Sequence, residues 1–195
     1  MLNIQSQLFE SADVRFGPID HEKDPEIESR WTHDSEFMRM METNPARPMS
    51  AAMIKKQYEK LEKQIEDDKN LYHFMIRAKA DDRLIGKAVL QRIEWTNGNC
   101  FLLLGIGSAE DRRKGYGTQA MQMLLRFAFA ELNLFRLTAA VPEYNEGAIA
   151  LMRKFGFTQE VCRRSALERD GRRWDLYIFG LLKDEWQLSA TRARP

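Results

Sequence analysis

An apolar run followed by a short basic turn with two glycines is the feature that most restricts how this chain can fold. The run covers residues 101–106, the turn reads Arg-Arg-Lys-Gly-Tyr-Gly-Thr over residues 112–118, and a helical pattern follows to about residue 132. A strand that turns into a helix presents free backbone N–H groups at the positive end of the helix dipole. Gly115 and Gly117 permit positive φ angles and leave room for a ligand close to the backbone. The segment therefore predicts a site for a phosphate-bearing ligand.

The composition is that of one ordinary domain without a strong overall charge. The chain has 195 residues, enough for one domain with its own core and short for two. Charged residues make up 30% and leave a net charge of +1, so no overall field favours nucleic acid or an anionic membrane. We expect a single domain over residues 1–195, with a core from about 14 to 186 and a polar, frayed tail over 187–195.

No segment is typical of a membrane span or a secretory signal. No apolar run approaches the roughly 20 residues that a span needs, and the first seven residues lack the basic and apolar regions of a signal peptide. Cys100 and Cys162 have no metal-ligand spacing, so we expect two reduced thiols in the core. The three histidines, His21, His33 and His73, are expected on the surface. These observations predict a cytoplasmic protein without a bound metal.

Hydrophobic periodicity and turn residues predict a mixed sheet flanked by helices. Strands are expected at 14–19, 72–77, 84–90, 93–95, 100–106 and 136–141, and on both sides of a turn at 169–172. Helices are expected at 24–41, 51–68 behind a Ser50 cap, 118–132 and 146–155. Turn residues near 81 and 98 indicate an antiparallel meander, whereas the later strand, helix, strand order implies a parallel crossover. The result is an α+β fold around a mostly antiparallel sheet of about seven strands.

Two known phosphate-binding motifs compete for the basic turn. Residues 115–120 match the G-x-G-x-x-A spelling of a dinucleotide fingerprint, and Glu143 stands near the end of the next strand, where a ribose-binding carboxylate would be sought. Against this, residues 108–114 separate the turn from its strand, and that strand belongs to a meander. A Walker loop fails because no Gly-Lys-Ser/Thr follows. The turn by itself also fits glycines that merely start a helix.

A second motif favours one interpretation of the turn. It reads Asn145-x-x-Ala148-x-x-Leu151-x-x-x-Phe155-Gly156-Phe157. This order of strand, helix, glycine cap and aromatic residue resembles the GNAT superfamily of acyl-CoA N-acyltransferases. The turn that begins at Arg112 is similar to the Q/R-x-x-G-x-G/A pyrophosphate loop of that superfamily. The resemblance covers about residues 14–186. It implies the GNAT fold, with helices on both faces of a sheet splayed between strands 4 and 5. The last hairpin most resembles the branch of ribosomal-protein N-terminal and polyamine acetyltransferases.

The resemblance implies acetyl-CoA as co-substrate and assigns residues to it. The pantetheine arm would bond to the backbone at about Ile106 and Ser108, and Asn145 would bond this arm or a nearby water. Gly105 and Gly107 are expected to permit its close approach. The pyrophosphate would be held by the loop residues Arg112, Arg113, Lys114, Gly115, Tyr116, Gly117 and Thr118.

The implied reaction is direct attack of a neutral primary amine on the thioester, with coenzyme A thiolate as the leaving group. It needs a base, an oxyanion donor, expected from the backbone near Ile106, and an acid. Many family members carry a tyrosine as the acid where this chain has Met152. Tyr144 is the substitute acid in our interpretation. Glu94 and Glu168 are the candidate bases.

The acceptor implied by the resemblance is a protein amino terminus or a small amine. The region where the family's acceptor groove lies contains Trp31, His33, Asp34, Glu36 and Glu42. The excess of acidic residues among them suits a cationic amine, and the same residues also fit a solvated amphipathic helix. Arginines gather on the last hairpin without the interleaved aromatic residues that indicate nucleic acid. We expect a monomer or homodimer, with no nucleic acid and no membrane as partner. The alternatives are a weakly active acyl-CoA sensor or interaction module, motivated by Met152, and a nucleotide-dependent oxidoreductase.

Overall fold

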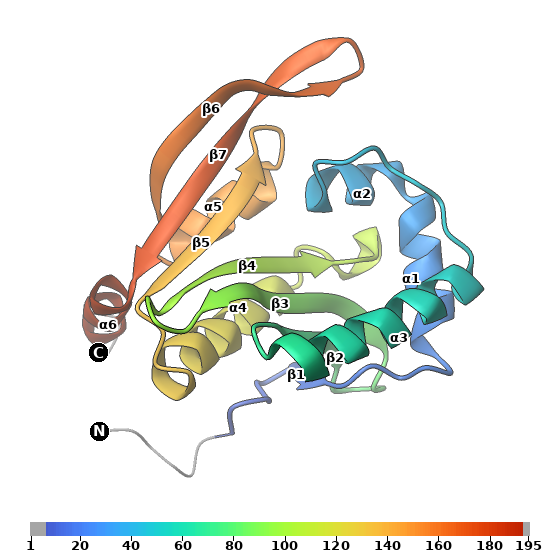
Figure 1. The fold of residues 1–195 in the computed structure, drawn as a ribbon, viewed down its shortest axis with the longest axis horizontal. Coiled ribbons are helices and arrows are strands. Elements are labelled where there is room, and N and C mark those ends of the chain that lie inside the picture. The colour runs from blue at the N-terminus through green and yellow to red at the C-terminus, as the bar shows by residue number, and fades with distance from the viewer. Residues whose placement is uncertain (1–6, 193–195) are drawn as a thin grey trace.

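A seven-stranded sheet lies between two layers of helices in the computed structural model, which describes residues 7–192 (Figure 1). The strand order is β1-β2-β3-β4-β5-β7-β6, and all neighbours are antiparallel except the parallel pair β4 and β5. This arrangement confirms the predicted mixed, mostly antiparallel sheet. The strands are β1 (Val14–Gly17), β2 (Tyr72–Ala78), β3 (Leu84–Glu94), β4 (Asn99–Ile106), β5 (Arg136–Pro142), β6 (Thr158–Arg169) and β7 (Arg172–Leu182).

The helices divide between the two faces of the sheet (Figure 1). One face carries α1 (Asp24–His33), α2 (Ser35–Met41) and α3 (Ala51–Asp68), and the other carries α4 (Tyr116–Arg126) and α5 (Glu146–Lys154). A 3-10 turn, η1 (Ala109–Asp111), precedes α4, a π-helix, η2 (Phe127–Glu131), extends it, and α6 (Lys183–Arg192) follows β7. Among the helices of residues 7–192, none has the length and apolar character to cross a membrane.

Strand alternation explains the two cores. Ile76 and Ile85 belong to the larger core with α4, α5 and η2, whereas Met75 and Leu84, one residue earlier in each strand, belong to a smaller core with α1, α2 and α3. Successive side chains of a strand point to opposite faces, so β2 and β3 are covered on both sides. The larger core and the smaller core therefore lie on opposite faces of the same strands.

Three predicted elements differ in extent from the observed ones. The helix expected over 24–41 is broken at Asp34, whose extended backbone (φ −85°, ψ 100°) and carboxylate, which accepts from Glu36 N and Phe37 N, start a new helix. The strands expected at 84–90 and 93–95 are one strand, β3, with an irregularity at Arg92 (φ 53°). The tail expected over 187–195 is helical to Arg192, and its residues 193–195, like residues 1–6, lie outside the described part.

Two predictions about side-chain location are wrong. Cys162 is exposed because β6 is the edge strand of the sheet, and its thiol lies 3.1 Å from Asp175 Oδ2, which raises the pKa of Cys162. His73 lies on β2 beside Lys87, with a buried Nδ1 that has no partner among the described residues. Burial, helped by the Lys87 charge, lowers the pKa of His73 to about 4. Cys100 is buried, as predicted.

Candidate active site

The parallel strands β4 and β5 separate after three paired positions. Their last pair is Phe101 with Thr138, so the rest of β4 has no strand on that side. Gly107 N donates to Ile85 O at 2.9 Å, which places Gly107 among the residues bonded to β3. Because an antiparallel ladder alternates, the N–H and C=O groups of Leu104 and Ile106 point away from β3, into the gap. The splay thus presents the N–H groups of both residues and the Leu104 carbonyl, while the Ile106 carbonyl accepts from Arg112 Nε at 3.4 Å.

The first turn of α4 presents a second group of free donors beside this gap. Gly115 precedes the helix in a left-handed conformation (φ 85°), no side chain caps the helix, and the bond from Gln119 N to Gly115 O begins the helical series. The N–H groups of Tyr116, Gly117 and Thr118 therefore lack intrahelical acceptors. A Cβ on Gly117 would meet only Ile106 Cγ1 at 3.8 Å and Leu104 Cδ2 at 3.9 Å, so protein packing does not require glycine there.

An ion pair between a buried carboxylate and a partly exposed guanidinium fixes the loop before α4. Asp111 is 1% exposed, and its carboxylate receives Arg83 Nη1 at 2.5 Å and Nη2 at 2.9 Å. These bonds raise the pKa of Arg83. No sequence pattern pointed to this anchor, since the two partners are 28 positions apart and Asp111 looks like one charge among several. The anchor holds the loop in place before any ligand binds.

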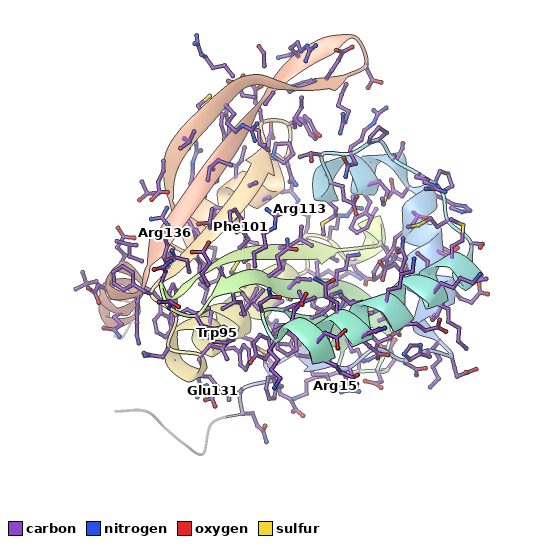
Figure 2. All side chains as sticks on the ribbon, in the orientation of Figure 1. Arg15, Trp95, Phe101, Arg113, Glu131 and Arg136 are labelled. Atoms are coloured by element: carbon purple, nitrogen blue, oxygen red, sulfur yellow. The ribbon has the colours of Figure 1, made fainter. Side chains whose placement is uncertain are left out.

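The three cations of the loop have different surroundings. Arg112 turns back to the protein, where Nη2 donates to Gly107 O at 2.8 Å and lies 3.4 Å from Asp34 Oδ2. Arg113 and Lys114 are exposed, and Lys114 Nζ lies 3.9 Å from the Asp111 carboxylate. Figure 2 shows Arg113 above the β4 ribbon in this view, between α5 and α2. Arg112 therefore serves to hold the loop against β4, and the two exposed cations are the ones free to meet a ligand.

The expected role of Gly105 and Gly107 needs correction. A Cβ on Gly105 would overlap the Met41 thioether, and one on Gly107 would overlap the Trp31 ring. Trp31 Nε1 also donates to Ser108 Oγ at 3.3 Å. The close approach at these glycines is therefore made by side chains of α1 and α2 and not by the pantetheine arm.

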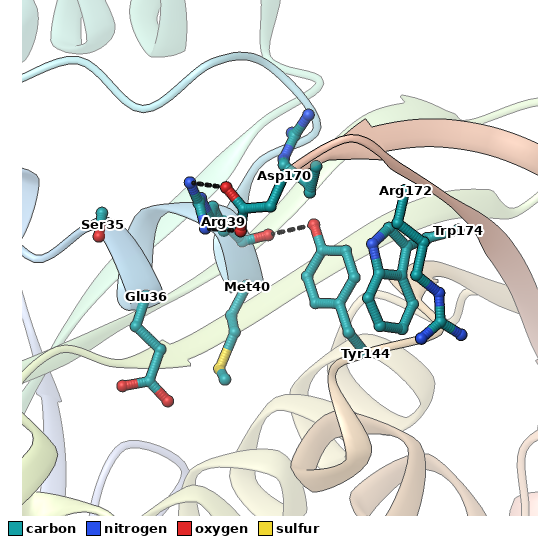
Figure 3. Close-up of a pocket in the computed structure, with 9 residues that line it drawn as sticks. Ser35, Glu36, Arg39, Met40, Tyr144, Asp170, Arg172 and Trp174 are labelled. Carbon is teal, nitrogen blue, oxygen red and sulfur yellow. Dashed lines mark hydrogen bonds and ion pairs between the residues drawn. The ribbon is translucent and has the colours of Figure 1, made fainter.

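A cavity of about 450 Å³ lies between α2, the segment after β5 and the tip of the β6–β7 hairpin (Figure 3). Three contacts bring these parts together. Tyr144 OH donates to Arg39 O at 2.8 Å, the Arg39 guanidinium holds the Asp170 carboxylate at 2.7 and 3.1 Å, and Arg169 Nη2 donates to Thr43 O at 2.7 Å. The lining residues are Ser35, Glu36, Arg39, Met40, Tyr144, Arg169, Asp170, Arg172 and Trp174.

Asn145 positions the start of α5. Its Oδ1 accepts from Ala148 N at 3.0 Å and caps the helix, and its Nδ2 donates to Met40 O at 3.1 Å. Both bonds fix the neighbouring Tyr144 beside α2. The expected contact of Asn145 with the pantetheine arm stays a prediction.

The two candidate bases do not join this constellation. Glu94 lies at the β3–β4 turn, where it accepts from Asn97 Nδ2 at 3.1 Å, at the opposite end of β4 from Ile106. Glu168 is exposed and lies 3.0 Å from the Arg173 guanidinium, outside the cavity lining. Arg39, Arg172 and Trp174 were not predicted as neighbours of Tyr144, because no local pattern links residues so far apart in the chain.

Comparison with known proteins points to one family. Residues 13–158 match the family model described as an acetyltransferase (GNAT) domain. An uncharacterized N-acetyltransferase, p20, of Bacillus licheniformis is 33% identical over 113 residues, which are 58% of this chain and 63% of that protein. The match thus spans less than two thirds of that relative.

Solved structures share the fold at low identity. A spermidine N-acetyltransferase from Vibrio cholerae, in complex with CoA and spermine, has a TM-score of 0.77 and 18% identity, covering 89% of this chain and 98% of that one. A structure described as a putative ribosomal-protein-serine acetyltransferase from Vibrio cholerae has a TM-score of 0.71 and 18% identity, covering 89% and 96%.

Proposed function

The chain belongs to the GNAT acetyltransferase family, and from this premise we propose that it moves an acetyl group from acetyl-CoA to a primary amine. The observation that carries the proposal is the meeting of two groups of unpaired donors, at the splayed edge of β4 and at the first turn of α4. A helix N-terminus with glycines favours phosphate, and an open strand edge favours an amide-bearing chain. Pantetheine attached to a pyrophosphate has both features.

The chain's residues divide the work of holding acetyl-CoA. The N–H groups of Tyr116, Gly117 and Thr118 receive the pyrophosphate, with Arg113 and Lys114 supplying charge at the rim. The edge of β4 at Leu104 and Ile106 binds the pantetheine amides, and Arg112 and Asp111 keep the loop in position. The backbone space at Gly117 fits this role, because nothing in the protein fills it.

The cavity beside Tyr144 is the acceptor site in this proposal. The amine nitrogen bonds to the thioester carbonyl carbon, a tetrahedral oxyanion forms near the Ile106 N–H, and the C–S bond breaks to release the thiolate. The amine proton leaves to water, the thiolate takes a proton from Tyr144, and the tyrosinate regains a proton from water. Met152 has no part in proton transfer, since it is buried at 4% exposure and has no titratable group. Glu94 and Glu168 are not proposed as bases because neither lines the cavity.

The proposal is tested by thiol release from acetyl-CoA in the presence of a panel of primary amines. Tyr144→Phe is expected to lower kcat roughly 100-fold, the lower range of general acid catalysis, with little change in the KM for acetyl-CoA. Tyr72→Phe, on the distant strand β2, is the matched control and keeps full activity. An unchanged kcat in Tyr144→Phe removes Tyr144 as the acid. Tight acetyl-CoA binding without thiol release on the whole panel favours the weakly active sensor instead.

The setting of the activity is part of the same proposal. The chain acts as one domain in the cytoplasm, as a monomer or homodimer, on a small amine or a protein amino terminus.

A further inference from the structure

The acceptor cavity contains more positive than negative side chains. Its lining includes the carboxylates of Glu36 and Asp170 and three guanidiniums, those of Arg39, Arg169 and Arg172. Arg39 and Asp170 pair through two bonds and cancel. What remains is one carboxylate and two guanidiniums, so an acceptor with only positive charges meets net repulsion.

Most of these groups are already occupied by the protein. Arg169 donates to the backbone carbonyls of Thr43 at 2.7 Å, Asn44 at 3.3 Å and Glu168 at 2.7 Å. Its donors hold the hairpin tip against the segment after α2. Arg169 therefore adds charge to the cavity but has little capacity for a ligand.

Two opposite charges are available to a ligand. The Arg172 Cζ atom lies 3.8 Å from the centroid of the Trp174 ring, and the guanidinium makes no hydrogen bond or ion pair within the described part of the chain. Glu36 is 65% exposed at its side chain, and its carboxylate lies 3.9 Å from Arg112 Nη1, beyond hydrogen-bond distance. Figure 3 shows the Glu36 carboxylate and the Arg172 guanidinium on different sides of Tyr144.

Two aromatic side chains, Trp174 and Tyr144, lie between these charges, and Trp174 adds a hydrogen-bond donor. Trp174 lines the cavity, its ring meets Tyr144 edge-on at 5.4 Å, and its buried Nε1 has no acceptor among residues 7–192. A buried N–H without a partner is costly, and an oxygen of a bound molecule removes that cost. A carbonyl beside the acceptor amine has the right chemistry.

We propose that the cavity selects primary amines that carry an anionic group a few bonds away, with a protein amino terminus followed by Asp or Glu as the preferred form. The proposal rests on the proposed function, because it names the acceptor class of the same site. Glu36 receives the ammonium form on entry, Arg172 receives the anionic group, and Trp174 Nε1 donates to a carbonyl. Polyamines offer no group for Arg172 and are poor acceptors, which distinguishes this chain from its structural neighbour, the spermidine N-acetyltransferase.

The test compares four acceptors at saturating acetyl-CoA, with kcat/KM measured by thiol release. They are a peptide beginning Ser-Asp-Glu, the matched peptide beginning Ser-Lys-Lys, free aspartate and spermidine. The acidic peptide is expected to exceed the basic peptide and spermidine by at least ~10-fold, which corresponds to about 1.4 kcal/mol. Free aspartate above the acidic peptide keeps the charge rule and identifies a free amino acid as the source of the amine.

Charge reversal at Arg172 separates this rule from a general effect on folding. Arg172→Glu is expected to lower kcat/KM for the acidic peptide at least ~10-fold and to raise it for the basic peptide, with acetyl-CoA affinity unchanged. Arg173→Glu is the control, since Arg173 is the next residue on the strand and does not line the cavity. Spermidine as the best acceptor, or an acceptor ranking that Arg172→Glu leaves unchanged, overturns the inference while the acetyltransferase stands. No thiol release with any acceptor overturns both.

Discussion

Two pairs of glycines stand ten residues apart on either side of the loop between β4 and α4, and they are glycine for different reasons. Gly105 and Gly107 are filled from within the protein, because Met41 and Trp31 occupy the space that a Cβ would take. Gly115 and Gly117 face open space, because a Cβ on Gly115 would have no atom within 4 Å and one on Gly117 would have none nearer than 3.8 Å. Side chains of the protein occupy the space at Gly105 and Gly107, whereas the space at Gly115 and Gly117 is empty. The second pair therefore marks where a ligand is expected to bind.

The largest effect, a loss of folding stability, is expected from adding a side chain at Gly105 or Gly107. Gly107→Ala places a methyl group inside the Trp31 ring, which also packs edge-on against Phe37 at 5.8 Å and is bonded to Ser108. Overpacking of this kind costs roughly 1–3 kcal/mol in unfolding free energy, and more where the ring cannot move. The denaturant midpoint measures it, with an unchanged m-value.

Gly147→Ala is the control for this change. Gly147 lies in the first turn of α5, and a Cβ there would meet only Asn145 Oδ1 at 3.9 Å. The denaturant midpoint of Gly147→Ala should equal or exceed that of the parent protein, because alanine has a higher helix propensity than glycine. Equal stability of Gly107→Ala and the parent protein would show that Trp31 does not close this position.

The second effect is on binding and not on folding. Gly117→Asp places a carboxylate among the N–H groups of the first turn of α4 and is expected to raise the Kd for acetyl-CoA at least ~10-fold, about 1.4 kcal/mol. The same carboxylate stabilises the helix dipole, so the melting temperature without ligand should not fall. Calorimetric titration and a thermal melt together check both signs.

Gly117→Ala separates charge from volume at the same position. The methyl group has room beside Ile106 and Leu104, so Gly117→Ala should keep the fold and lose less affinity than Gly117→Asp. An acetyl-CoA affinity that Gly117→Asp leaves intact is the result that contradicts the assignment of the loop.

The sequence predicted turns and helix caps correctly where the pattern lies within a few neighbouring residues. The Gly115 turn, the Ser50 cap and the Asn145 motif are contiguous patterns whose geometry follows from a few neighbouring residues, and each appears in the structure as a turn or cap. The break at Asp34 was also local, since an Asp before Ser-Glu is a helix cap signal, but the prediction started one helix at Asp24-Pro25 and ran it across this signal.

The acceptor cavity could not be predicted because its parts meet only in the folded chain. Arg39 and Asp170, which close it, are 131 positions apart. The same limit explains Gly105 and Gly107, whose covering side chains come from helices far upstream in the chain. A glycine in a strand indicates a close approach, but the sequence does not say whether a side chain or a ligand makes it.

The smallest effect on stability is expected from Gly115→Ala, a change that tests the backbone conformation without adding a steric contact. Gly115 has φ 85° and nothing within 4 Å of the position a Cβ would take, so Gly115→Ala adds strain without a clash. The left-handed conformation costs alanine roughly 1–2 kcal/mol, and part of that is returned by the lower entropy of the unfolded chain. Gly156→Ala, at φ 81° and equally open after α5, should lose the same stability. Only Gly115→Ala should also weaken acetyl-CoA binding, because only Gly115 aims the donors of α4. Equal binding by both variants would mean that the turn forms without help from this glycine.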